Sequence, residues 1–98
     1  MYARVITFHY QPGKVEEALH ILRETVIPEL QQLPGFKGAT NLVDYGHDKV
    51  VGMTLWDSKD DLQGSGMNKL QARFAKISAY LAAMPTVEVY EVSDEQRY

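Results

Sequence analysis

Hydrophobic and polar positions follow the same order twice along this chain. In each half, a strand-like apolar run leads into a long amphipathic helix, and a second strand-like run follows. The predicted strands are 2–10, 36–45, 49–56 and 86–92, and the predicted helices are 14–33 and 58–83. This β-α-β-β-α-β order predicts an α+β protein with a ferredoxin-like sandwich, in which helices cover one face of an antiparallel four-stranded sheet.

The first helix carries an apolar stripe that recurs every three or four residues, as expected of a helix facing a core. The stripe consists of Val15, Leu19, Leu22, Val26 and Leu30. Pro28 lies inside this pattern, where it removes a backbone donor and crowds the carbonyl of Glu24. We therefore expect a kink or a restart of the helix near Ile27.

The second helix shows a clear start and an early interruption. Ser58 is a good N-cap, and Asp61 follows three residues later. Gly64-Ser65-Gly66 predicts a break between a short leading turn and a main helix over 67–83, which Pro85 closes. The apolar stripe of this helix consists of Leu70, Phe74, Ile77 and Leu81.

Strand 2–10 is apolar or bulky on both alternations, which indicates that both of its faces are buried at least in part. Helices are expected on one face of the sheet, so the other face needs a different cover. We expect a second copy of the chain to supply it, in a homodimer. The two alternations are Ile6, Phe8 and Tyr10 on one side and Ala3, Val5, Thr7 and His9 on the other.

Composition narrows the class of protein. The 98 residues suit a single domain with a polar tail at 93–98, and the net charge of −3 without a Lys/Arg cluster argues against a nucleic-acid partner. There is no cysteine, and 1–10 lacks the features of a signal peptide. No segment approaches the roughly 20 apolar residues that span a bilayer. We expect a soluble cytoplasmic protein without a membrane partner.

Two side chains are the candidate catalytic residues. Trp56 stands at a strand end beside a helix start, where its indole could line a pocket and donate one hydrogen bond, or simply pack in the core. His9 lies on the alternation opposite Phe8 and Tyr10. Its imidazole could act as a general base near neutral pH, or form a hydrogen bond at an interface.

Further polar side chains are candidates for binding a substrate. Asn41, Tyr45 and Tyr80 could contact a small ligand, although residues of these types are common at strand surfaces and element ends. Arg4 and Arg73 could hold a carboxylate, or be solvated surface charges. No two histidines stand at i, i+4 and there is no H-E-x-x-H run, so we expect no metal site.

Three short motifs resemble the antibiotic biosynthesis monooxygenase family of the dimeric α/β-barrel superfamily. They are Gln11-Pro12-Gly13-Lys14, Leu33-Pro34-Gly35-Phe36 and Leu55-Trp56-Asp57-Ser58, and the similarity runs from Ala3 to Val92. The resemblance implies a homodimer in which two sheets form a barrel with the helices outside. It also implies a pocket between each sheet and its own helices, and oxygenase chemistry that needs no cofactor.

Two activities of that family can be compared residue by residue. Haem-degrading members use an asparagine, a tryptophan and a histidine where this chain has Ile6, Ser65 and Ala75, so haem chemistry is disfavoured. Quinone-forming members use an asparagine four residues before the strand-end tryptophan. Trp56 is present, but Gly52 occupies the asparagine position. Two functions therefore stay open: a monooxygenase of small aromatic or quinone-like metabolites, and a non-catalytic dimeric module that binds a small ligand or has a structural role.

Overall fold

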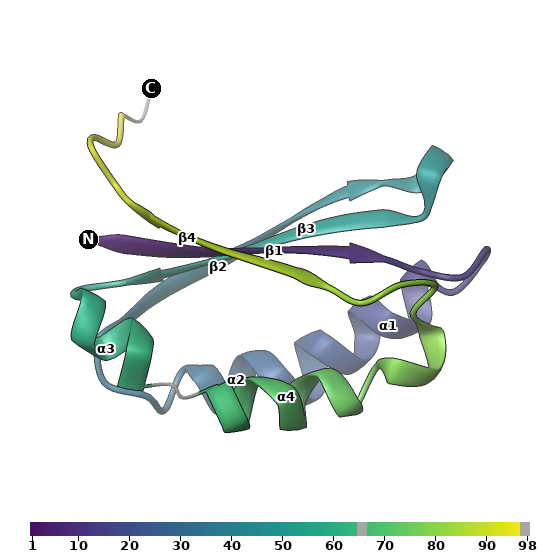
Figure 1. Cartoon of the computed structure of the whole chain (residues 1–98), viewed down its shortest axis with the longest axis horizontal. Coiled ribbons are helices and arrows are strands. Elements are labelled where there is room, and N and C mark those ends of the chain that lie inside the picture. Colours follow the sequence, from purple (N-terminus) through teal and green to yellow (C-terminus); the bar gives the residue numbers. More distant parts are fainter. Residues whose placement is uncertain (65–66, 97–98) are drawn as a thin grey trace.

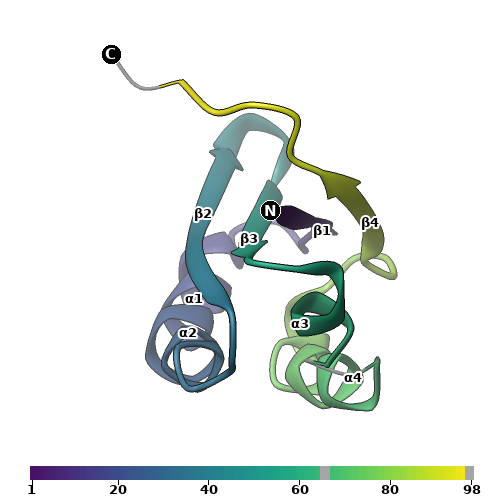
Figure 2. The ribbon, with the colours of Figure 1, turned by 90° about the vertical axis from the view of Figure 1, so that its left-hand side faces the viewer.

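The sheet consists of four antiparallel strands in the order β2-β3-β1-β4. The computed structural model describes residues 1–64 and 67–96, and the side chains in these ranges apart from those of 67–70. The described helices all lie against one face of the sheet (Figure 1, Figure 2). The predicted α+β ferredoxin-like fold is therefore confirmed. The strands are β1 (Tyr2–His9), β2 (Phe36–Asp44), β3 (Lys49–Trp56) and β4 (Thr86–Glu91).

The first helical layer runs from residue 15 to 30 and changes its winding in the middle. It comprises α1 (Val15–Ile21), a π-helical turn (Leu22–Val26) and α2 (Ile27–Leu30). Pro28 stands in the first turn of α2, where a missing N–H is tolerated. The wider turn just before it supplies the local rewinding that a proline inside a helix requires. The predicted restart at Ile27 is confirmed, and all five residues of the apolar stripe are buried.

The second helical layer is shorter than the sequence predicts. It comprises α3 (Lys59–Gly64), α4 (Met67–Ala75) and a 3-10 turn, Ser78–Tyr80. The Ser58 hydroxyl accepts a hydrogen bond from the backbone N–H of Asp61 at 3.1 Å, which confirms the predicted N-cap. Ser65 and Gly66, within the predicted break, lie outside the described residues.

The prediction of one helix over 67–83 is wrong at its C-terminal end. After Ala75 the chain leaves the helix and runs back to the end of β1. There the N–H of Ala82 donates to the carbonyl of His9 at 2.8 Å, and the N–H of Gln11 donates to the carbonyl of Tyr80 at 2.8 Å. These tertiary hydrogen bonds replace the helical hydrogen bonds that the local pattern favours.

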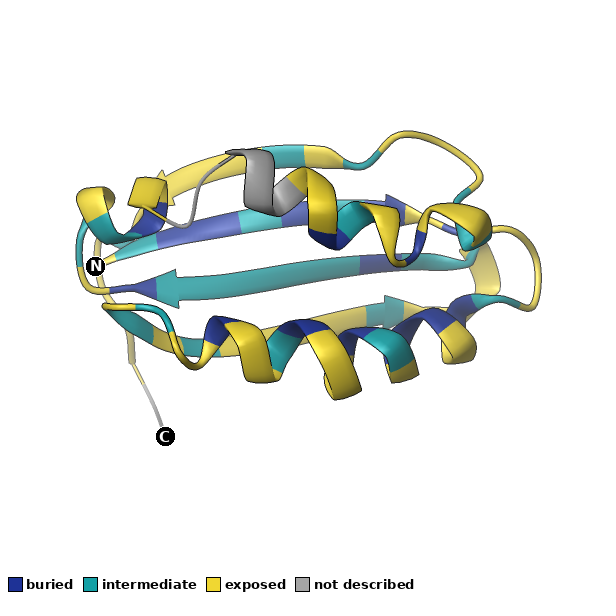
Figure 3. Ribbon diagram, turned by 90° about the horizontal axis from the view of Figure 1, so that it is seen from below, coloured by how far each residue is buried: buried dark blue, intermediate teal, exposed yellow. Residues whose placement is uncertain are grey.

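The core lies between the sheet and the helices. Alternate residues of β1, among them Ile6 and Phe8, point to the helical layer, where they meet buried side chains of the first helix, Val50 of β3 and Ile77. Figure 3, seen from the helical side, shows the buried residues following the inner sides of the helices and the central strands. Each large apolar side chain removed from water here contributes about 1.5–3 kcal/mol.

The opposite face of the sheet has no cover within the described chain. Leu42 and Tyr90 belong to the alternation that faces away from the helices, and they are 61% and 51% exposed. Val5, Val51 and Leu55 on the same face are half-buried by their neighbours. In the described residues, no helix is long and apolar enough to cross a membrane.

Candidate functional site

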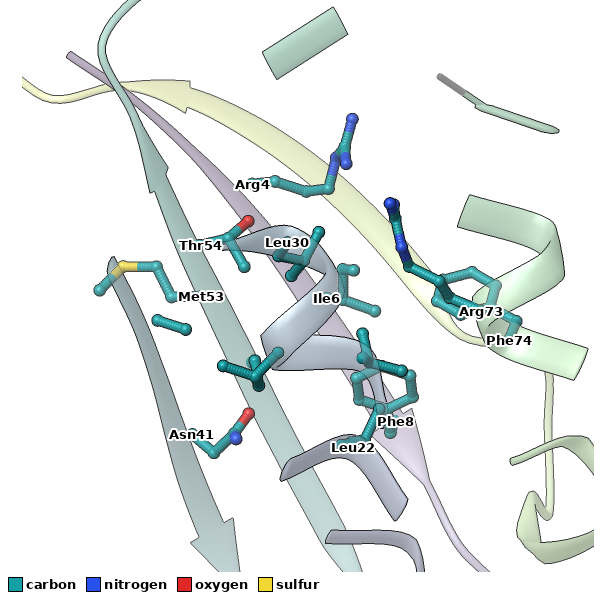
Figure 4. Close-up of a pocket in the computed structure, with 14 residues that line it drawn as sticks. Arg4, Ile6, Phe8, Leu22, Leu30, Asn41, Met53, Thr54, Arg73 and Phe74 are labelled. Atoms are coloured by element: carbon teal, nitrogen blue, oxygen red, sulfur yellow. The ribbon is translucent and has the colours of Figure 1, made fainter. Parts of the chain in front are cut away.

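A cavity lies between the sheet and the helical layer, and about 610 Å³ of space is free of atoms when its open mouth is included. Figure 4 shows side chains from the strands and from both helical layers converging on it. The lining residues are Arg4, Ile6, Phe8, Leu22, Val26, Ile27, Leu30, Ala39, Asn41, Gly52, Met53, Thr54, Arg73 and Phe74.

The wall of the cavity is largely apolar and partly aromatic. Phe8 of β1 and Phe74 of α4 meet edge to face, with ring centroids 5.8 Å apart and planes at 87°. The π-helical turn brings Leu22 and Val26 to the same space. Such a surface favours a flat apolar ligand, because aromatic edges and faces pack well against another ring.

Asn41 supplies a carboxamide to this wall from β2. It is paired with Gly52 of β3, and both line the cavity. A Cβ added to Gly52 would lie 3.0 Å from Asn41 Oδ1 and 3.6 Å from a ring carbon of Phe8. Because Gly52 has no side chain, the space next to the Asn41 carboxamide stays open. A carboxamide is present next to position 52 although position 52 itself has no side chain.

Two arginines lie at one end of the cavity (Figure 4). Arg4 of β1 is 7% exposed and Arg73 of α4 is 4% exposed. The alternative that these are solvated surface charges is therefore wrong. Arg4 Nη2 donates to the carbonyl of Leu62 at 3.0 Å. Burial, and next the nearby charge of Arg73, lower the pKa of Arg4.

One signal in the sequence pointed to Arg4. It lies on the same strand alternation as Ile6 and Phe8, which the pattern already places toward one face. A charged residue on a core-facing alternation is uncommon unless it has a partner. For Arg73 the signal was weaker, because the helix pattern around it is interrupted.

The candidate catalytic residues Trp56 and His9 do not lie together, and neither lines the cavity. Trp56 is 0% exposed. Its indole N–H donates to the Thr54 hydroxyl at 3.0 Å, and its ring meets Phe36 at a centroid distance of 5.4 Å. His9 is exposed at the end of β1, on the face of the sheet away from the helices. The core-packing alternative describes the surroundings of Trp56, and the roles of both residues in catalysis stay predictions.

Among the candidate substrate-binding residues, Asn41 lines the cavity and the two tyrosines do not. Tyr45 is 63% exposed in the turn after β2, where its hydroxyl donates to the Glu16 carboxylate. Tyr80 is half-buried in the 3-10 turn and packs against the core. Of the five predicted site residues, the structure thus brings only Asn41 to the cavity that Arg4 and Arg73 also line.

Solved structures of other proteins share this fold over nearly the whole chain. A monooxygenase from the gene ActVA-Orf6 of Streptomyces coelicolor, solved with the ligand nanaomycin D, superposes with a TM-score of 0.81 at 20% identity, covering 99% of this chain and 91% of that protein. A candidate antibiotic biosynthesis monooxygenase from Caulobacter crescentus CB15 gives a TM-score of 0.77 at 19% identity, with coverage of 95% and 90%. One from Nitrosomonas europaea gives 0.78 at 12% identity, with coverage of 96% and 100%.

The sequence is similar to two other proteins and matches one family model. Two uncharacterized proteins of Mycobacterium tuberculosis, from strains CDC 1551 / Oshkosh and H37Rv, are each 29% identical to this chain over 65 residues. The match spans 66% of this chain but 28% of the length of each relative. The family model for antibiotic biosynthesis monooxygenases matches residues 1–76. With its fold and its sheet–helix cavity, the chain therefore belongs to the antibiotic biosynthesis monooxygenase family.

Proposed function

We propose that the protein is a cofactor-independent monooxygenase that oxidises a small phenolic or quinol-like aromatic metabolite. The observation that carries this proposal is the cavity between sheet and helices, with aromatic walls and a carboxamide at Asn41. Membership of the family and the similarity to a monooxygenase solved with a ligand support it.

The reaction can be balanced without a further reductant. A phenol that loses its O–H hydrogen and one ring C–H hydrogen gives a quinone, and dioxygen supplies the new carbonyl oxygen. The second oxygen atom leaves as water with the two hydrogens. The ring is oxidised by four electrons and dioxygen is reduced by four. An electron-rich phenolate can pass an electron to dioxygen directly, so the protein has to bind, orient and desolvate the ring.

The residues of this chain would divide these tasks by their chemistry. Phe8 and Phe74 would hold the ring, and the Asn41 carboxamide would donate a hydrogen bond to the phenolic oxygen. The ionisable lining residues that the structure describes are Arg4 and Arg73. Both are donors that favour an anion and neither is a good base. We therefore expect the substrate to react as its phenolate anion, because the two positive charges would lower the pKa of its hydroxyl group.

The same observation favours a second candidate function. Because no carboxylate or imidazole is present among the described lining residues, the cavity could bind an aromatic ligand without transforming it. The sequence differences from the family at Ile6, Gly52, Ser65 and Ala75 support this alternative of a non-catalytic binding module. The two functions differ in one observable: turnover consumes oxygen and binding does not.

A homodimer is part of the proposal. The sheet face that carries Leu42 and Tyr90 has no cover within the described chain, and an apolar surface of this kind is typical of an interface. We propose that a second copy covers it, as the family resemblance implies. A monomer by light scattering at micromolar concentration would contradict this proposal. Leu42→Lys, which places a charge on that face, should shift a dimer toward monomer.

The direct test is oxygen consumption with a panel of naphthols, anthrones and hydroquinones, with quinone formation followed by absorbance. We expect Asn41→Leu to lose at least ten-fold in kcat/KM, because one hydrogen bond to an anion contributes about 1.5–3 kcal/mol. Glu24→Gln, on the exposed side of the first helix, is the matched control. His9→Ala tests the prediction from sequence that His9 assists proton transfer, and unchanged turnover would reject that role. Binding without oxygen consumption across the panel would leave the non-catalytic alternative.

A further inference from the structure

At the arginine end of the cavity, the described side chains give Arg73 an incomplete set of partners. The carboxylate of Glu29 is the acidic partner of Arg73, with Oε1 3.8 Å from Arg73 Nη2. That distance is beyond a hydrogen bond. The same carboxylate, 47% exposed, is closer to Lys76, at 3.3 Å between Oε2 and Nζ. One half-exposed carboxylate thus serves two cations, Arg73 and Lys76.

Two nitrogen atoms of the Arg73 guanidinium have no hydrogen-bond acceptor among the described residues. Its Nε and Nη1 atoms are buried and have no hydrogen-bond partner among the side chains and backbone groups that the structure describes. The side chain as a whole is 4% exposed and lines the cavity. Burying a charge costs free energy unless hydrogen bonds and an opposite charge compensate it. Among the described residues, that compensation is incomplete at Arg73.

An oxyanion in the cavity would supply what is missing. A guanidinium binds carboxylates with short charge-assisted hydrogen bonds, and it is less strongly hydrated than an ammonium group. The burial of Arg4 and the charge of Arg73 lower the pKa of Arg4, and a negative group between them would relieve this repulsion. The rest of the wall, with Ile6, Phe8 and Phe74, requires an apolar body.

We propose that the cavity selects an aromatic carboxylic acid, with its carboxylate bound by Arg73 and Arg4 and its ring packed against Phe8 and Phe74. This inference rests on the proposed function in one respect, since it names the class of substrate for the same site. The selectivity itself is a property of binding. It can be measured without oxygen or turnover.

The experiment compares two probes that share one ring system and differ in charge. Binding of 2-naphthoate and of 2-naphthamide is measured by titration calorimetry on the whole chain near neutral pH. We expect the naphthoate to bind about 10- to 100-fold more tightly, as hydrogen bonds from a buried cation to an anion imply. In Arg73→Met this preference should fall to about two-fold or less, and the affinity for naphthamide should be unchanged. Arg23→Met, an exposed position on the first helix, should leave both affinities unchanged.

A second measurement separates a ligand-binding arginine from a structural one. If Arg73 served the fold, Arg73→Met would lower the urea midpoint of the ligand-free protein. We expect the midpoint to stay the same or rise, because an apolar side chain of similar length replaces an incompletely paired buried charge. Arg73→Lys should keep part of the preference for naphthoate through its charge.

Three results would overturn the inference. They are equal binding of the two probes by the unmodified protein, binding of neither, and a preference for naphthoate that survives in Arg73→Met. Should Arg73→Met not fold, the comparison of the two probes on the unmodified protein decides. Turnover of neutral phenols without a preference for acids would sustain the proposed function and reject this inference. Arg73-dependent binding of naphthoate without oxygen consumption by any phenolic acid would do the reverse.

Discussion

Replacing Trp56 by alanine should destabilise the fold more than any change confined to the cavity wall. The side chain is 0% exposed, so the substitution removes a large buried ring and leaves a hole. Buried Trp→Ala substitutions cost about 3–5 kcal/mol. That range includes about 0.5–1.5 kcal/mol for the edge contact with Phe36 and about 1 kcal/mol for the hydrogen bond to Thr54. Because domains of this size are stable by about 5–15 kcal/mol, the loss approaches the total at the lower end.

Urea unfolding followed by far-ultraviolet circular dichroism measures this loss at a fixed protein concentration, which matters if the chain dimerises. Trp56→Phe keeps most of the ring and should cost about 1–2 kcal/mol. Tyr45→Ala, an exposed aromatic, should change the free energy of unfolding by less than about 0.5 kcal/mol. A cost below about 1 kcal/mol for Trp56→Ala, together with lost turnover, would refute the assignment of Trp56 to the core and favour a direct catalytic role.

Three further substitutions test the local physics. Gly35→Ala should cost more than about 2 kcal/mol by thermal unfolding, because φ is +77° and the new Cβ would clash with the side chain of Asp61. Gly13→Ala, with φ +78° and nothing within 4 Å, is its control and should cost about 1 kcal/mol. Ser58→Ala should cost about 1 kcal/mol through the lost N-cap. Burial raises the pKa of Tyr10, so its contribution to stability is complete below the pKa of about 10 of an unfolded tyrosine and is lost as pH rises above it. In Tyr10→Phe, the alkaline fall of the urea midpoint should be shallower, and an unchanged slope would contradict this reasoning.

Element order and the buried stripe of the first helix followed from local pattern. The stripe from Val15 to Leu30 was visible because burial against a sheet forces apolar residues to recur with the period of the helix. The restart at Ile27 followed from the missing donor of Pro28, and the hydrogen bond of Ser58 followed from cap chemistry. Each of these is decided by residues within about one turn of each other, so the sequence alone contains the necessary information.

The site depended on contacts between distant segments. Trp56 had two interpretations from sequence, and its contacts with Phe36 and Thr54 became visible only in the tertiary structure. The helix expected to reach residue 83 ended at Ala75 because Ala82 pairs with His9, a contact across more than seventy residues that no local propensity encodes.

By itself the sequence determined the class of fold, the buried stripe of the first helix and the family, because periodicity and short motifs record local structure. The tertiary structure alone decided that Arg4 and Arg73, apart in sequence, lie buried at one end of one cavity, and that Asn41 lies beside the space left by Gly52. The physical reason is that the cost of burying a charge depends on what surrounds it in three dimensions. Those surroundings are set by strand register and helix packing, which a linear pattern does not contain.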